Sequence, residues 1–120
     1  MLPAMARFPF EAVRDLLGIL RALYAADRAR GANERRLGHI RSVAVELRRS
    51  MELALDHEVG TPGHRAAVRR AEAATRRLAD LVDVTTPLEP TLLAAGQRVR
   101  AEGLRGGERE ARRRARNDRS

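Results

Sequence analysis

Apolar residues recur at every third or fourth position along most of this chain, which is the spacing of one face of an α-helix. The first such segment spans about residues 9–30, and its apolar arc covers roughly half of the helix circumference, more than one bundle contact needs. The second spans residues 34–58, and the third spans residues 62–83. No stretch alternates between apolar and polar residues for long enough to indicate a β-strand. The pattern therefore predicts a helical chain.

Residues at the predicted boundaries support this division. Gly31 is placed to end the first helix, and Gly60 is placed to end the second. Asn33 can cap the second helix, and Thr61 can cap the third, which has Pro62 at its first position. The connections between these helices are short, which favours antiparallel neighbours.

A fourth helix is predicted from the segment Thr86-Pro87-Leu88-Glu89, which has the residues of a capping box. This helix ends near residue 102. We therefore expect an all-α fold, in which residues 1–102 form an up-down-up-down antiparallel four-helix bundle.

The composition changes at Gly103. Residues 103–120 contain seven arginines, three acids and three glycines, and Leu104 is their one apolar residue larger than alanine. Such a segment cannot bury enough apolar surface to fold alone. We expect residues 103–120 to form a flexible, arginine-rich tail.

Side chains suited to catalysis or metal binding are few. The chain has no cysteine, which excludes disulfides, thiolate metal sites and a cysteine nucleophile. His39, His57 and His64 form no i, i+4 pair on one helix, and no serine lies in a nucleophile elbow. The sequence therefore predicts no catalytic residue, no metal site and no cofactor, and the protein is not expected to be an enzyme.

The charge is strongly basic: 24 arginines and no lysine stand against 16 acids, for a formal net charge of +8. Arginine binds phosphate in a bidentate manner, so this balance is compatible with nucleic acid. Arg65, Arg69 and Arg76 fall within about 40° of one another on the third helix, with Arg70 and Arg77 in a second column. The residues predicted to contact nucleic acid are Arg41, Arg48, Arg49, Arg65, Arg69, Arg70, Arg76, Arg77, Arg112, Arg113, Arg114 and Arg116.

No aromatic residues are interleaved with these arginines, so the sequence predicts no platform on which bases could stack. Contacts would go to backbone phosphates of RNA or DNA and would be independent of base sequence. The alternative interpretation is that these arginines form an ordinary solvated helix surface.

Two motifs resemble a known family. In the second helix, Ile40-Arg41 is followed at seven residues from the isoleucine by Leu47 and then by Ser50-Met51. In the third helix, Ala73-Ala74 precedes Leu78. These spacings resemble the four-helix-bundle family of ribosomal RNA intervening-sequence proteins, which includes the accessory variability determinants of diversity-generating retroelements. In place of the asparagine and the glutamate of the family pattern, this chain has Ser50 and Arg77.

The resemblance implies a homo-oligomeric ring, with a pentamer as the first expectation, and a basic surface that binds nucleic acid and a partner reverse transcriptase. In this chain Val45 and Leu53 are expected to project outward from the second helix and to form the oligomer interface. No apolar run is long enough to span a bilayer, and the first residues lack the pattern of a signal peptide. A cytoplasmic location without membrane contact is therefore expected.

These observations favour a non-enzymatic nucleic-acid-binding accessory protein that acts as a homo-oligomeric scaffold and assists a reverse transcriptase. The alternative, from a different class, is a homo-oligomeric protein-interaction bundle with no nucleic-acid role.

Overall fold

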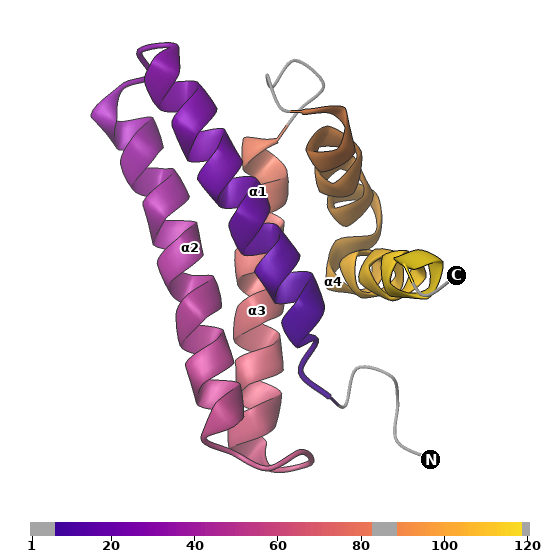
Figure 1. Cartoon of the computed structure of the whole chain (residues 1–120). Helices are drawn as coiled ribbons and strands as arrows, with labels where there is room; N and C mark the ends of the chain where they lie inside the picture. The colour runs from indigo at the N-terminus through magenta and orange to yellow at the C-terminus, as the bar shows by residue number, and fades with distance from the viewer. Residues whose placement is uncertain (1–6, 83–88, 119–120) are drawn as a thin grey trace.

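The computed structural model describes residues 7–82 and 89–118, with the backbone alone at positions 106, 107, 110, 111, 114 and 118. Four helices make up nearly all of these ranges (Figure 1): α1 (Phe10–Ala29), α2 (Glu34–Leu55), α3 (Pro62–Leu81) and α4 (Pro90–Asp118). The prediction of an all-α chain with four main helices is confirmed, and no strand occurs within the described residues.

The helices share one aliphatic core. Helix α1 packs against α2 and α4, and α3 packs against the same two helices. Leu16 and Leu23 of α1, Leu47 of α2 and Leu78 of α3 are almost completely buried in this core. Burial of such side chains contributes about 1.5–3 kcal/mol each to folding. No helix in the described residues is long and apolar enough to cross a membrane.

Both predicted caps between the first three helices are confirmed. The side chain of Asn33 accepts a hydrogen bond from the Arg36 amide at 2.9 Å, and the Thr61 hydroxyl accepts one from the His64 amide at 3.3 Å. Gly31, with φ of 78°, follows α1 as predicted. However, α2 ends at Leu55, before the predicted end at residue 58. The Thr61 amide and hydroxyl both donate to the carbonyl of Glu58 in the turn before α3.

The fourth helix begins later than its predicted capping box. Residues 83–88 lie outside the described residues, and α4 starts at Pro90. The Glu89 carboxylate accepts hydrogen bonds from the amides of Thr91 at 3.2 Å and Leu92 at 3.3 Å, and these bonds lower the pKa of Glu89. Because a residue before proline disfavours the helical conformation, Glu89 caps the helix and does not belong to it.

The structure differs from the prediction of a flexible tail over residues 103–120, because it describes helix up to Asp118. Helix α4 continues to Asp118, but Gly103 (φ 69°, ψ −157°) divides it into a first arm, residues 90–102, and a second arm, residues 104–118. Leu104 is buried in the core just after this kink, and Glu102 pairs with Arg109 at 3.1 Å across it. The buried leucine and the ion pair anchor the start of the second arm, which sequence composition alone does not reveal.

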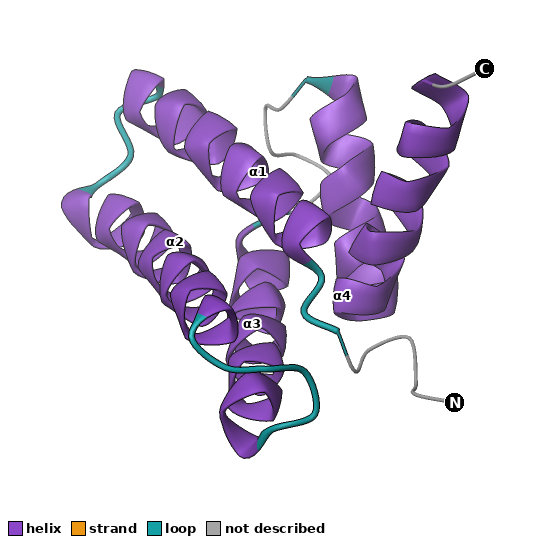
Figure 2. Ribbon diagram, turned by 60° about the horizontal axis from the view of Figure 1, so that its bottom comes forward, coloured by secondary structure: helices purple, strands orange, loops and turns teal. Residues whose placement is uncertain are grey.

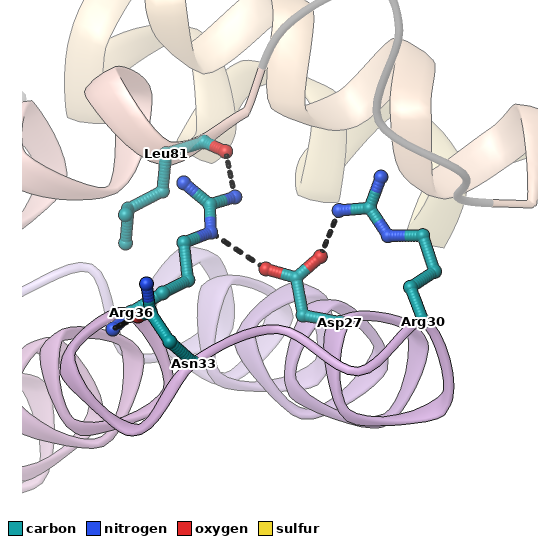
Figure 3. Close-up of polar contacts among 5 residues, drawn as sticks. All are labelled: Asp27, Arg30, Asn33, Arg36 and Leu81. Carbon is teal, nitrogen blue, oxygen red and sulfur yellow. Dashed lines mark hydrogen bonds and ion pairs between the residues drawn. The ribbon is translucent and has the colours of Figure 1, made fainter.

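A buried carboxylate joins three helix ends (Figure 3). Asp27 of α1 is fully buried and accepts hydrogen bonds from Arg30 and from Arg36, the latter at 2.6 Å. Arg36 of α2 also donates to the carbonyl of Leu81 at the end of α3, at 2.9 Å. Burial raises the pKa of Asp27, but the hydrogen bonds from Arg36 and Arg30 outweigh it and hold this pKa below its ordinary value of 3.8.

Candidate nucleic-acid interface

Figure 2 shows the second arm of α4 turning back beside the first arm. Residues of both arms line a basic cleft. We define the arginine cleft by five residues that line one cavity of about 640 Å³: Arg98, Arg109, Arg112, Arg113 and Arg116. Glu11 of α1 is the one acid among the described residues that line this cavity. A second cavity, of about 390 Å³, is also lined by Arg98 and Arg113 and extends the cleft along the first arm.

Helix geometry explains why these guanidinium groups converge. Positions 109, 112, 113 and 116 follow the i, i+3, i+4, i+7 pattern, so they share one face of the second arm. The kink at Gly103 turns this face toward Arg98 on the first arm. A concave surface lined mainly by one sign of charge concentrates its electric field. Arg109 pairs with Glu102 at 3.1 Å and Arg112 pairs with Glu108 at 2.6 Å, so a phosphate in the cleft would compete with these carboxylates.

A smaller cavity, of about 260 Å³, lies at the kink between α3 and α4. Arg76 of α3 lines it together with Arg100 and Arg105 of α4, and Glu72 and Glu102 partly balance their charge. Arg76 is thereby close to α4, which sets it apart from the other arginines of its predicted stripe.

The remaining stripe on α3 is exposed as predicted. Arg65, Arg69 and Arg76 all have exposed side chains. Arg65 donates a hydrogen bond to the carbonyl of Gly60 at 2.6 Å, next to the start of the helix. Arg65 and Arg69 can reach a phosphate from this exposed face of α3.

The predicted second column on α3 is different, because its side chains contact α2. Arg70 pairs with Glu46 at 3.6 Å, and Arg77 donates to the hydroxyl of Ser42 at 3.1 Å. Arg49 shares Glu46 at 3.9 Å. The expectation of an open column of phosphate-binding residues is corrected here: these arginines connect α2 with α3.

The other predicted arginines fall elsewhere. Arg41 donates to the Tyr24 hydroxyl at 2.8 Å and lies 5.6 Å from the centre of its ring. Arg48 lines a groove between α1 and α2. The side chain of Arg114 lies outside the described residues. The structure thus brings Arg112, Arg113 and Arg116 together but separates them from the α2 set.

One of the two residues predicted to project outward from α2 is exposed, and the oligomer interface itself stays a prediction. Val45 is 38% exposed, whereas Leu53 is half-buried against the core, so the expectation that Leu53 projects outward is wrong. Helix α2 contacts both α1 and α3, and this wide contact covers the side that carries Leu53. The other exposed large apolar side chains of the described residues are Leu55 and Val59, at the end of α2.

Sequence reasoning missed Arg98, Arg100, Arg105 and Arg109. Their signal was the arginine content on both sides of Gly103, but only the kink makes the two sides face each other. Within the described residues, no three His, Cys, Asp or Glu side chains gather into a group that could hold a metal ion. No family model, no curated protein and no solved structure matches the chain.

Proposed function

We propose that this protein is a non-enzymatic nucleic-acid-binding accessory protein that holds RNA or DNA phosphates in the arginine cleft. The observation that carries the proposal is the convergence of five guanidinium groups, from both arms of α4, on a cavity with one described acid. Each guanidinium offers several N–H donors in a planar fork that matches phosphate oxygens.

Contacts in this cleft would not read base sequence. The three aromatic residues of the chain are engaged elsewhere: Phe8 is buried and packs on Phe10, and Tyr24 is covered by Arg41. Without a free aromatic surface, binding energy comes from phosphate neutralisation and the release of counterions.

The arrangement and assembly of the chain belong to the same proposal. We propose that the four helices form the up-down-up-down antiparallel bundle, which the short connections and the helix pairs in contact support. We further propose that the second arm of α4 keeps the flexibility that its composition predicts until phosphates in the cleft hold it against the first arm. The family resemblance given above supports a homo-oligomer and a reverse transcriptase partner as parts of this proposal, and the absence of an apolar run long enough to span a bilayer supports a cytoplasmic location.

The test compares three triple variants that each remove three positive charges. Arg112, Arg113 and Arg116 become Gln in the cleft variant, and Arg65, Arg69 and Arg76 become Gln in the stripe variant. The control changes the exposed Arg14, Arg28 and Arg35 to Gln. Affinity for single-stranded and duplex oligonucleotides is measured by fluorescence anisotropy over a range of salt concentrations.

We expect the cleft variant to weaken binding most and to reduce the slope of log affinity against log salt by about two to three units. The loss should be similar for unrelated sequences, while the control keeps nearly full affinity. An equal loss in all three variants would mean that only net charge matters. Full affinity in the cleft variant would refute the proposal.

A second candidate function is a protein-interaction bundle without a nucleic-acid role. The groove between α1 and α2, which has an apolar floor, favours this alternative. Protein that purifies free of nucleic acid at low salt, and that binds no oligonucleotide there, would support it.

A further inference from the structure

A groove between α1 and α2 combines an apolar floor with a basic rim. Its cavity has a volume of about 370 Å³. The floor consists of Leu17, Leu20, Ile40 and Ala44, and the rim consists of Arg21, Tyr24, Arg41 and Arg48. Arg21 and Arg48 make no ion pair within the described part of the chain. This groove fits an apolar side chain that is flanked by carboxylates.

The same chain exposes such a segment at the end of α2. Leu55 is 73% exposed and Val59 is 44% exposed. Glu52, Asp56 and Glu58 surround them, are exposed, and make no side-chain ion pair within the described residues. In a chain of net charge +8, this acidic and apolar end complements the basic rim of the groove.

The groove and the α2 end lie on one side of α2. Arg41, Arg48 and Leu55 are spaced by seven residues, so their directions fall within about 40° of one another. Ala44 and Leu55 are about 16 Å apart along the helix axis. Helix α2 cannot bend its own end back into the groove that it lines, so an α2 end that fills this groove must belong to a second copy of the chain.

We propose that two copies of this chain pair through antiparallel α2 helices related by a two-fold axis near Ser50. In this register Leu55 of one copy enters the groove beside Ala44 of the other, and Arg48 faces the partner's Glu52. Arg41 then faces the partner's Glu58. Because the contact is isologous, every one of these pairs forms twice.

This pairing goes beyond the proposed nucleic-acid function, since the arginine cleft on α4 takes no part in it. It also differs from a ring of five. An isologous contact is complete with two copies, whereas a ring requires a head-to-tail contact.

The experiment measures the mass of the nuclease-treated full chain by sedimentation equilibrium at micromolar concentration and roughly 0.15 M salt, where the Debye length is about 8 Å. We expect wild type at twice the chain mass of 13.3 kDa. Arg48→Glu places like charges opposite each other twice and should raise the dissociation constant about a hundredfold. The double variant Arg48→Glu with Glu52→Arg restores both pairs and should restore the dimer.

The matched control is Arg35→Glu, which makes the same charge change on the other side of α2 and should leave the dimer intact. Circular dichroism verifies that each variant stays helical. A wild-type monomer, a mass of five chains, or a double variant that stays monomeric would overturn the proposal. Glu52→Arg alone also places like charges opposite each other and should give a monomer that still binds oligonucleotide, so failure of the dimer and failure of the nucleic-acid function give different results.

Discussion

The ion cluster around Asp27 allows a quantitative test of what holds the upper ends of α1, α2 and α3 together. We consider Arg36→Met, which keeps the aliphatic stem of the side chain but removes its guanidinium. Arg36 donates one hydrogen bond to the Asp27 carboxylate at 2.6 Å and one to the Leu81 carbonyl at 2.9 Å. The substitution removes both bonds and leaves the fully buried Asp27 carboxylate with Arg30 as its one remaining partner among the described residues.

The expected cost follows from these contacts. Hydrogen bonds to charged groups contribute about 1.5–3 kcal/mol each, and loss of one partner of a buried ion pair costs about 3–5 kcal/mol. Arg30 still contacts Asp27, and the Arg36 side chain is 35% exposed, so the lower part of this range applies. We expect the free energy of unfolding to fall by about 3 kcal/mol, with a decrease in Tm of about 10 °C.

Arg30→Met is the matched control, because Arg30 contacts the same carboxylate but is 51% exposed and, among the described residues, bonds to no other helix. Its cost should be about 1 kcal/mol. Urea unfolding followed by circular dichroism measures both. In an Asp27→Asn background, Arg36→Met should cost about 1–2 kcal/mol, because only the Leu81 bond is then charge-assisted. Equal costs for the two arginine variants, or no coupling to Asp27, would refute this account.

The pH dependence has a definite sign. The folded-state pKa of Asp27 lies below its ordinary value of 3.8, so its stabilisation is complete above that pH and is lost as the pH falls through the lower, folded-state pKa. In Arg36→Met, Arg30 alone opposes the effect of burial, so the pKa of Asp27 rises. We therefore expect acid unfolding of this variant to begin at a higher pH than in wild type.

Three further expectations concern glycines and the second arm of α4. Gly18→Ala should raise the free energy of unfolding by about 0.5–1 kcal/mol, since an added Cβ meets nothing within 4 Å. Gly96→Ala should not raise the Tm in thermal unfolding, because its added Cβ comes within 2.9 Å of the buried Val82 side chain. Gly103→Ala should lower the free energy of unfolding by about 1–3 kcal/mol if the kink is kept. If α4 straightens instead, the arms no longer share the arginine cleft and oligonucleotide affinity should fall. Truncation before Leu104 should lower the free energy of unfolding by about 2 kcal/mol, because it removes a buried side chain. Truncation after residue 105 keeps Leu104 and should avoid this loss.

The sequence by itself determined the helices and most of their ends. Apolar spacing and the caps at Asn33 and Thr61 act over three or four residues, so they need no distant partner. At the fourth helix, residues 86–88 of the predicted capping box lie outside the described residues, and Glu89 precedes the helix because Pro90 disfavours helical backbone at the residue before it.

Only the tertiary structure decided which arginines gather. Helical spacing indicates which residues share a face, but which helix packs against that face depends on contacts between residues far apart in the sequence. Arg70 and Arg77 have the spacing of a free column, yet α2 lies beside them. Gly103 is compatible with either a straight or a kinked helix, and the burial of Leu104 in a core built by the other helices favours the kink. The arginine cleft exists because of that long-range contact, which no local pattern encodes.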